Sequence, residues 1–109
     1  MKTTINLYSH NDIIATSEVV FNPIALIECY IKMLDTPQDF TLIVKTSEGM
    51  GETCYILGAN LRGEWNVVVE DDWFYPTGLD FTDRSEVIQY FKDCIRTSLE
   101  IDEINRTWA

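Results

Sequence analysis

The stretch of residues 63–83 (GEWNVVVEDDWFYPTGLDFTD) constrains the fold of this chain more than any other. Trp65, Val67 and Val69 recur at every second position and predict a strand that buries one face. An acidic run, an aromatic run, and then a proline and a glycine follow, and the last two interrupt regular backbone. The rest of the chain therefore divides into a scaffold before this stretch and one long helix after it.

Runs of β-branched and apolar residues, separated by turn residues, predict strands at residues 3–9, 13–21, 40–46, 53–57 and 64–70. The last three runs are joined by short loops, so they are expected to form an antiparallel meander with residues 53–57 at its centre. For residues 13–21, a short helix capped by Asn11 is the alternative.

Two helices complete the predicted fold. Asn22-Pro23 is a good helix start, and Thr36-Pro37 ends this first helix by residue 35. The helix carries a broad apolar stripe, which indicates burial in the core or, alternatively, contact with a bound partner. Asp83 and Glu86 predict a capping box for the second helix. Its core stripe is Val87, Ile88, Phe91, Ile95 and Leu99, and a second set on a shifted face is Cys94, Ile101, Ile104 and Trp108.

The predicted fold class is α+β. An antiparallel sheet of three to five strands, in the chain order β-β-α-β-β-β-α, carries both helices on one face. A length of 109 residues fits one compact domain spanning residues 1–109. An apolar share of 46% with 12% aromatic residues is typical of a folded globule.

Charge is the most informative global property. The formal net charge is −10, and it is uneven. Residues 1–63 hold seven acids and four Lys/Arg (net −3), and residues 64–109 hold eleven acids and four Lys/Arg (net −7). Such a surface repels nucleic acid and anionic membrane and favours encounter with a basic partner, with solubility alone as the alternative.

The cysteines and the N-terminus favour a cytoplasmic protein. Cys29, Cys54 and Cys94 are an odd number without metal-ligand or disulfide spacing, so each is expected to be a small buried apolar residue in a reducing compartment. The N-terminal residues lack an apolar signal core, and no run approaches membrane-spanning length.

Metal and acid–base chemistry have little support in the sequence. Adjacent carboxylates at the end of a strand point in different directions, and no known metal-ligand spacing links them to Asp80 or Asp83. The single histidine, His10, lies in a predicted turn, and no nucleophile motif or phosphate loop is present. We expect no catalytic residue, cofactor or metal.

An acidic and aromatic corner at the head of the last helix is the predicted partner-binding site. Consecutive aromatic residues cannot all enter one core, and exposed aromatics rimmed by carboxylates suit a partner rich in arginine and lysine. The alternative is plain packing, with Trp73 and Tyr75 over the sheet edge and Phe74 beside the helix. The predicted site residues are Glu70, Asp71, Asp72, Trp73, Tyr75, Asp80, Asp83 and Glu86.

The expected function is that of a small acidic, non-enzymatic inhibitor that covers the basic nucleic-acid-binding surface of a nuclease or effector. In size, acidity and lack of catalytic motifs the chain resembles toxin-immunity proteins and phage-encoded anti-defence inhibitors, including anti-CRISPR proteins and DNA mimics. This is a resemblance of class, without a shared motif. The alternatives are a homo-oligomeric accessory subunit, a homodimer for example, that uses Trp108, and a small metal-dependent enzyme that uses carboxylates.

Overall fold

The computed structural model describes the backbone of residues 2–19, 23–48, 51–71 and 77–108, and the side chains of these residues except 48, 77 and 98–108. In this part of the chain the elements are β1 (Lys2–Ser9), β2 (Asp12–Val19), α1 (Ile24–Ile31), β3 (Phe40–Glu48), β4 (Gly51–Ala59), β5 (Trp65–Asp71), β6 (Thr77–Phe81) and α2 (Arg84–Trp108). The predicted α+β class is confirmed, and both predicted helices are present.

The strands form one antiparallel sheet in the order β2-β1-β3-β4-β5-β6. β4 lies between β3 and β5, which confirms the predicted meander and its centre. The prediction of three to five strands is too low, because the described residues form six. The missed strand is β6, which pairs with β5 from Val69–Thr77 to Trp65–Phe81. β6 was missed because it contains Gly78, and a glycine weakens the strand signal of a short segment.

Residues 13–21 are a strand for most of their length, not the alternative helix. β2 returns along β1 after a two-residue turn, in which His10 and Asn11 have φ values of 50° and 75°. Positive φ at both central positions is the geometry that matches the twist of two paired strands, and asparagine tolerates it well. His10 is exposed in this turn, as the sequence predicts.

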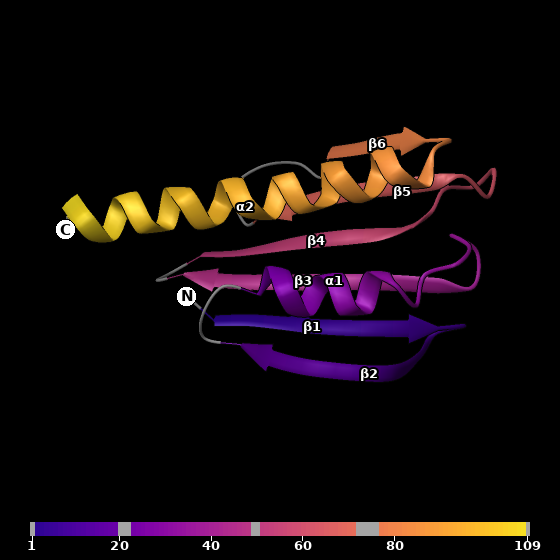
Figure 1. The fold of residues 1–109 in the computed structure, drawn as a ribbon, viewed down its shortest axis with the longest axis horizontal. Coiled ribbons are helices and arrows are strands. Elements are labelled where there is room, and N and C mark those ends of the chain that lie inside the picture. The colour runs from indigo at the N-terminus through magenta and orange to yellow at the C-terminus, as the bar shows by residue number, and fades with distance from the viewer. Residues whose placement is uncertain (1, 20–22, 49–50, 72–76, 109) are drawn as a thin grey trace.

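Both helices lie on the same face of the sheet, as predicted (Figure 1). The core between the layers combines every second residue of the strands with one stripe of each helix. The fully buried side chains include Ile5, Leu7, Leu42, Val44, Tyr55, Leu57 and Val67 from the sheet and Ile27, Leu34, Val87, Phe91 and Ile95 from the helical segments. The predicted core stripe of the last helix is thus confirmed at Val87, Phe91 and Ile95.

α1 is shorter than predicted because its last turn tightens. The backbone N–H groups of Met33 and Leu34 donate to the carbonyls three residues earlier, at 3.0 Å each, which ends the α-helix at Ile31. The guanidinium of Arg84 then caps the end, donating to the Leu34 carbonyl at 2.9 Å and the Ile31 carbonyl at 3.0 Å. The first residue of α2 therefore joins the two helices.

α2 begins where the sequence predicts. Asp83 accepts hydrogen bonds at Oδ1 from the backbone N–H groups of Ser85 (2.7 Å) and Glu86 (3.3 Å), as a helix cap does. A second link to α1 is the ion pair of Lys92 Nζ with Glu28 Oε1 at 3.3 Å. The last turns of α2 extend beyond the ends of the strands (Figure 1). The side chains of Leu99, Ile101, Ile104 and Trp108 lie outside the described residues.

Candidate functional site

The acidic end of β5 divides between the two faces of the sheet. Trp65 and Val67 are buried against the helices, and Asp71 shares their side of the strand. Glu70 therefore lies on the opposite face, together with Asn66 and Val68. We call this opposite face, the side of the sheet turned away from α1 and α2, the open face. In the part of the chain that the structure describes, no helix covers it.

The predicted partner-binding residues that the structure describes form two groups. Asp80 pairs with Asn66 at one end of β5, whereas Glu70 lies four residues further along that strand. At roughly 3.3 Å per residue the two positions are about 13 Å apart. Asp83 and Glu86 follow β6 at the Asp80 end. The other three predicted residues, Asp72, Trp73 and Tyr75, lie outside the described residues.

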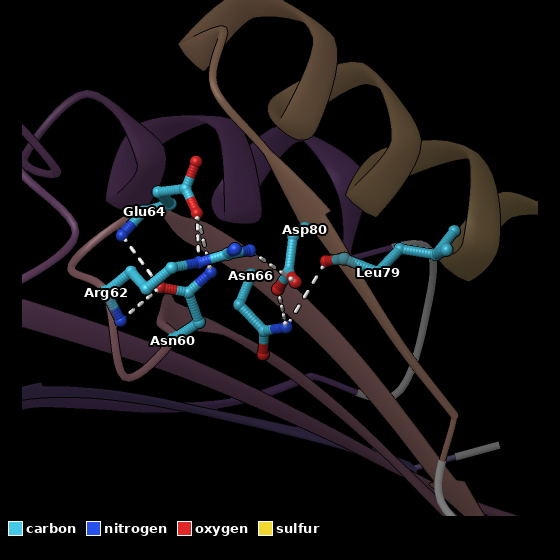
Figure 2. A network of polar contacts seen from close by, with 6 residues as sticks. All are labelled: Asn60, Arg62, Glu64, Asn66, Leu79 and Asp80. Atoms are coloured by element: carbon cyan, nitrogen blue, oxygen red, sulfur yellow. Dashed lines mark hydrogen bonds and ion pairs between the residues drawn. The ribbon is translucent and has the colours of Figure 1, made fainter.

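Of these residues, Asp80 belongs to a polar network around the β4–β5 turn (Figure 2). Asn60 Oδ1 accepts from the backbone N–H groups of Arg62 at 2.8 Å and Glu64 at 2.9 Å. Arg62 Nε lies 2.8 Å from Glu64 Oε1, and its Nη2 lies 3.5 Å from Asp80 Oδ2. Asn66 Nδ2 donates to Asp80 Oδ1 at 2.9 Å. Asp80 is therefore engaged within the chain.

The network attaches the edge strand β6 to the rest of the sheet. Asn66 Nδ2 also donates to the backbone carbonyl of Leu79 at 3.3 Å, so one amide holds two consecutive residues of β6. The pKa of Asp80 is lowered, first by hydrogen bonding to Asn66, then to Asn60, and by the charge of Arg62. Because these contacts stabilise the ionised carboxylate, the structure gives Asp80 a structural role of its own.

Asp83 and Glu86 are exposed, but Asp83 also caps α2. Glu86 lies in the first turn of the helix, where a negative charge interacts favourably with the helix dipole. Both carboxylates can meet solvent or a partner, although they lie at the other end of the sheet from Glu70.

At the Glu70 end, two carboxylates converge on one side chain of the open face. Cys54 pairs with Glu70 on β5 and with Lys45 on β3, in one row across three strands. The pKa of the Cys54 thiol is raised, mainly by burial, while Lys45 lowers it and Glu70 and Glu52 raise it. Glu52 was missed at the sequence level, because only the pairing of β4 with β5 brings it beside the acidic run.

A band of apolar side chains crosses the open face next to these carboxylates. Ile43, Ile56 and Val68 pair directly across β3, β4 and β5, and each is half-buried. They too were missed. The available signal was the presence of three consecutive apolar residues in each strand, Leu42-Ile43-Val44, Tyr55-Ile56-Leu57 and Val67-Val68-Val69. Since alternate residues face opposite sides, each triplet must place one apolar side chain on the open face.

The cysteines differ from the expectation of burial. All three are free thiols; Cys29 is exposed on α1, and Cys54 and Cys94 are half-buried. The prediction of a buried Cys29 is wrong, because its position falls on the outer side of α1, away from the buried Ile27 and Ile31. The pKa of Cys94 is raised by burial.

The described residues do not form a metal site or a membrane-spanning helix. Among these residues, no group of three or more His, Cys, Asp and Glu side chains could hold a metal ion. None of the described helices combines the length and apolar character needed to cross a membrane. Comparison with protein-family models, curated proteins and solved structures finds no match to this chain.

Proposed function

We propose that this protein is a small, non-enzymatic inhibitor that acts in the cytoplasm, where it binds a basic protein partner and covers the partner's nucleic-acid-binding surface. The partner would be a nuclease or an effector complex, as in toxin immunity or phage anti-defence. The observation that carries the proposal is the open face, where Glu70 lies two residues from Val68 on β5 and Val68 pairs with Ile56 on β4. Glu52 lies further along β4, beyond Cys54. Carboxylates and apolar side chains on one solvent-accessible sheet face suit recognition of a protein.

The mechanism is competition for the partner's arginine and lysine side chains. A surface with a net charge of −10 attracts a basic groove over a distance and speeds the encounter. Once bound, the carboxylates occupy cations that would otherwise contact phosphates, so the nucleic acid is excluded. The long-range attraction is screened by salt, with a Debye length of about 8 Å at physiological ionic strength.

The test is capture of a partner followed by a competition assay. The purified protein serves as bait in an extract of its own cells at low ionic strength, and retained proteins are identified by mass spectrometry. The expected partner is a basic nuclease or nucleic-acid-binding effector whose activity falls in proportion to added inhibitor. A duplex oligonucleotide should release it, and its association rate should fall steeply with salt. A partner that binds nucleic acid and inhibitor simultaneously, or whose binding is indifferent to salt, contradicts the proposal.

A further inference from the structure

We infer that the open face is the contact surface, and that it receives a protein surface presenting an arginine or lysine next to aliphatic side chains. The inference rests on the proposed function and replaces a purely acidic interface with a mixed one. The contact is centred on Ile56 and Val68, with Glu70 at its acidic border.

The apolar part of the argument comes from the sheet register. Ile43, Ile56 and Val68 are direct cross-strand neighbours, so their side chains form one continuous band over the central strands. Each retains partial solvent exposure, in contrast to the fully buried Leu42, Leu57 and Val67 on the helix side of the same strands. A partner that contacts this band removes apolar surface from water, which stabilises the complex without dependence on salt.

The charge of the occupant follows from Glu70. Glu70 is a half-buried residue opposite Cys54, and its carboxylate forms no ion pair among the described residues. The nearest cation in the row, Lys45, is two strands away, about 10 Å at the strand spacing of a sheet. A carboxylate without an ion pair at the border of an apolar band is therefore complementary to a partner cation that arrives together with aliphatic side chains.

The same observations disfavour a second copy of this chain as the occupant. Each copy carries a net charge of −10, so association of two copies is opposed by repulsion. A basic partner relieves the net negative charge, whereas a second copy doubles it.

Cys54 offers a direct test, because its thiol lies on the open face and Cys29 is exposed on the helix layer. The protein is alkylated with N-ethylmaleimide above neutral pH, since the Cys54 thiol has a raised pKa. The rates of alkylation of Cys54 and of Cys29 are measured by mass spectrometry. The probes are a short peptide of alternating arginine and leucine and a counterpart of arginine and serine. With the arginine–leucine peptide at about ten times its Kd, alkylation of Cys54 should slow about tenfold, and alkylation of Cys29 should not change.

Three outcomes overturn the inference: equal slowing by the arginine–serine peptide, equal slowing of both thiols, or no slowing at millimolar peptide. Failure of the proposed function is seen separately. In that case Cys54 is protected by the arginine–leucine peptide, but no nuclease or effector is inhibited.

Two matched pairs of variants locate the contact. Val68→Thr and Glu70→Lys should each weaken binding of the arginine–leucine peptide about tenfold. Met33→Thr and Asp35→Lys, which likewise replace an apolar residue with threonine and an acidic residue with lysine, lie at exposed positions after α1 and should leave the Kd within about twofold. One pair is Val68→Thr with Met33→Thr, and the other is Glu70→Lys with Asp35→Lys. The two members of a pair change the net charge equally, so a general loss of electrostatic attraction would affect both of them. Equal effects within either pair overturn the inference.

Discussion

Two adjacent valines of β5 give a sharp test of the open face, because identical substitutions should have opposite consequences. Val67 is 1% exposed and pairs with Leu57 and Leu79 on the helix side, whereas Val68 is half-buried on the other side. Valine and threonine have nearly the same shape and both favour strands. Val67→Thr and Val68→Thr therefore differ only in where the new hydroxyl is placed.

The expected magnitudes follow from burial. A hydroxyl placed in an apolar core without a partner costs about 1–3 kcal/mol, so Val67→Thr should lower the free energy of unfolding by about 2 kcal/mol. At about 4 °C per kcal/mol for a domain of this size, the Tm should fall by about 8 °C. Val68→Thr should change the free energy of unfolding by less than about 0.5 kcal/mol, because solvent can hydrate its hydroxyl.

Urea denaturation followed by circular dichroism measures both variants against the natural chain, with an unchanged m-value required for the comparison. The reasoning is refuted if Val68→Thr is as destabilising as Val67→Thr. That result would mean that the band formed by Ile43, Ile56 and Val68 is covered in the isolated protein. It would then be core, and the proposed contact surface would be lost.

Three further predictions concern contacts that hold the fold together. Arg84→Met should lower the free energy of unfolding by about 2 kcal/mol in a urea titration, because the end of α1 and the turn after it lose two charge-assisted hydrogen bonds. Arg96→Met, which among the described residues loses one exposed ion pair at 3.7 Å, should cost under about 0.5 kcal/mol. Gly63→Ala should lower the Tm, because Gly63 has a φ of 79°, which a residue with a Cβ rarely adopts, and the added Cβ would also meet the Gln38 side chain; an unchanged Tm would contradict this turn geometry. Asp80→Asn should be less stable than the natural chain at neutral pH, and the difference should shrink as the pH falls below about 4 and vanish only below the folded pKa of Asp80. The pKa of Asp80 is lowered in the folded state, so its stabilising contribution is present above the unfolded pKa and is lost as pH falls through the folded pKa; a difference independent of pH would contradict the role of the carboxylate.

The fold could be predicted from sequence wherever a local signal and the tertiary structure agree. The Asp83 cap has a side chain that satisfies its own helix, and the meander has short loops that leave its strands little choice of neighbour. β6 could not be predicted in this way. It contains Gly78 and spans only Thr77–Phe81, and its stability comes from pairing with β5 and from the Asn66 contacts to Leu79 and Asp80. Those contacts are long-range, so no local pattern indicates them.

The candidate site was less predictable than the fold, because proximity in sequence misrepresents proximity in space. Glu70 and Asp71 are adjacent in the chain but lie on opposite faces of the sheet. Asp80, which seemed close to them in sequence, lies at the other end of β5 and is bound to Asn66 and Arg62. Glu52, from the neighbouring strand β4, is the carboxylate that joins Glu70 near Cys54.

The acidic residue and the apolar band of the open face are consequences of one register. The segment Val67-Val68-Val69 has no alternation of its own, so its apolar pattern cannot decide which valine faces the helices. A shift by one residue would turn Asn66, Val68 and Glu70 inward. The shift would also turn the buried Trp65 outward and place the polar Asn66 in its position in the core. Burial of Trp65 in place of Asn66 therefore sets the register, and the same register places Val68 and Glu70 side by side on the open face.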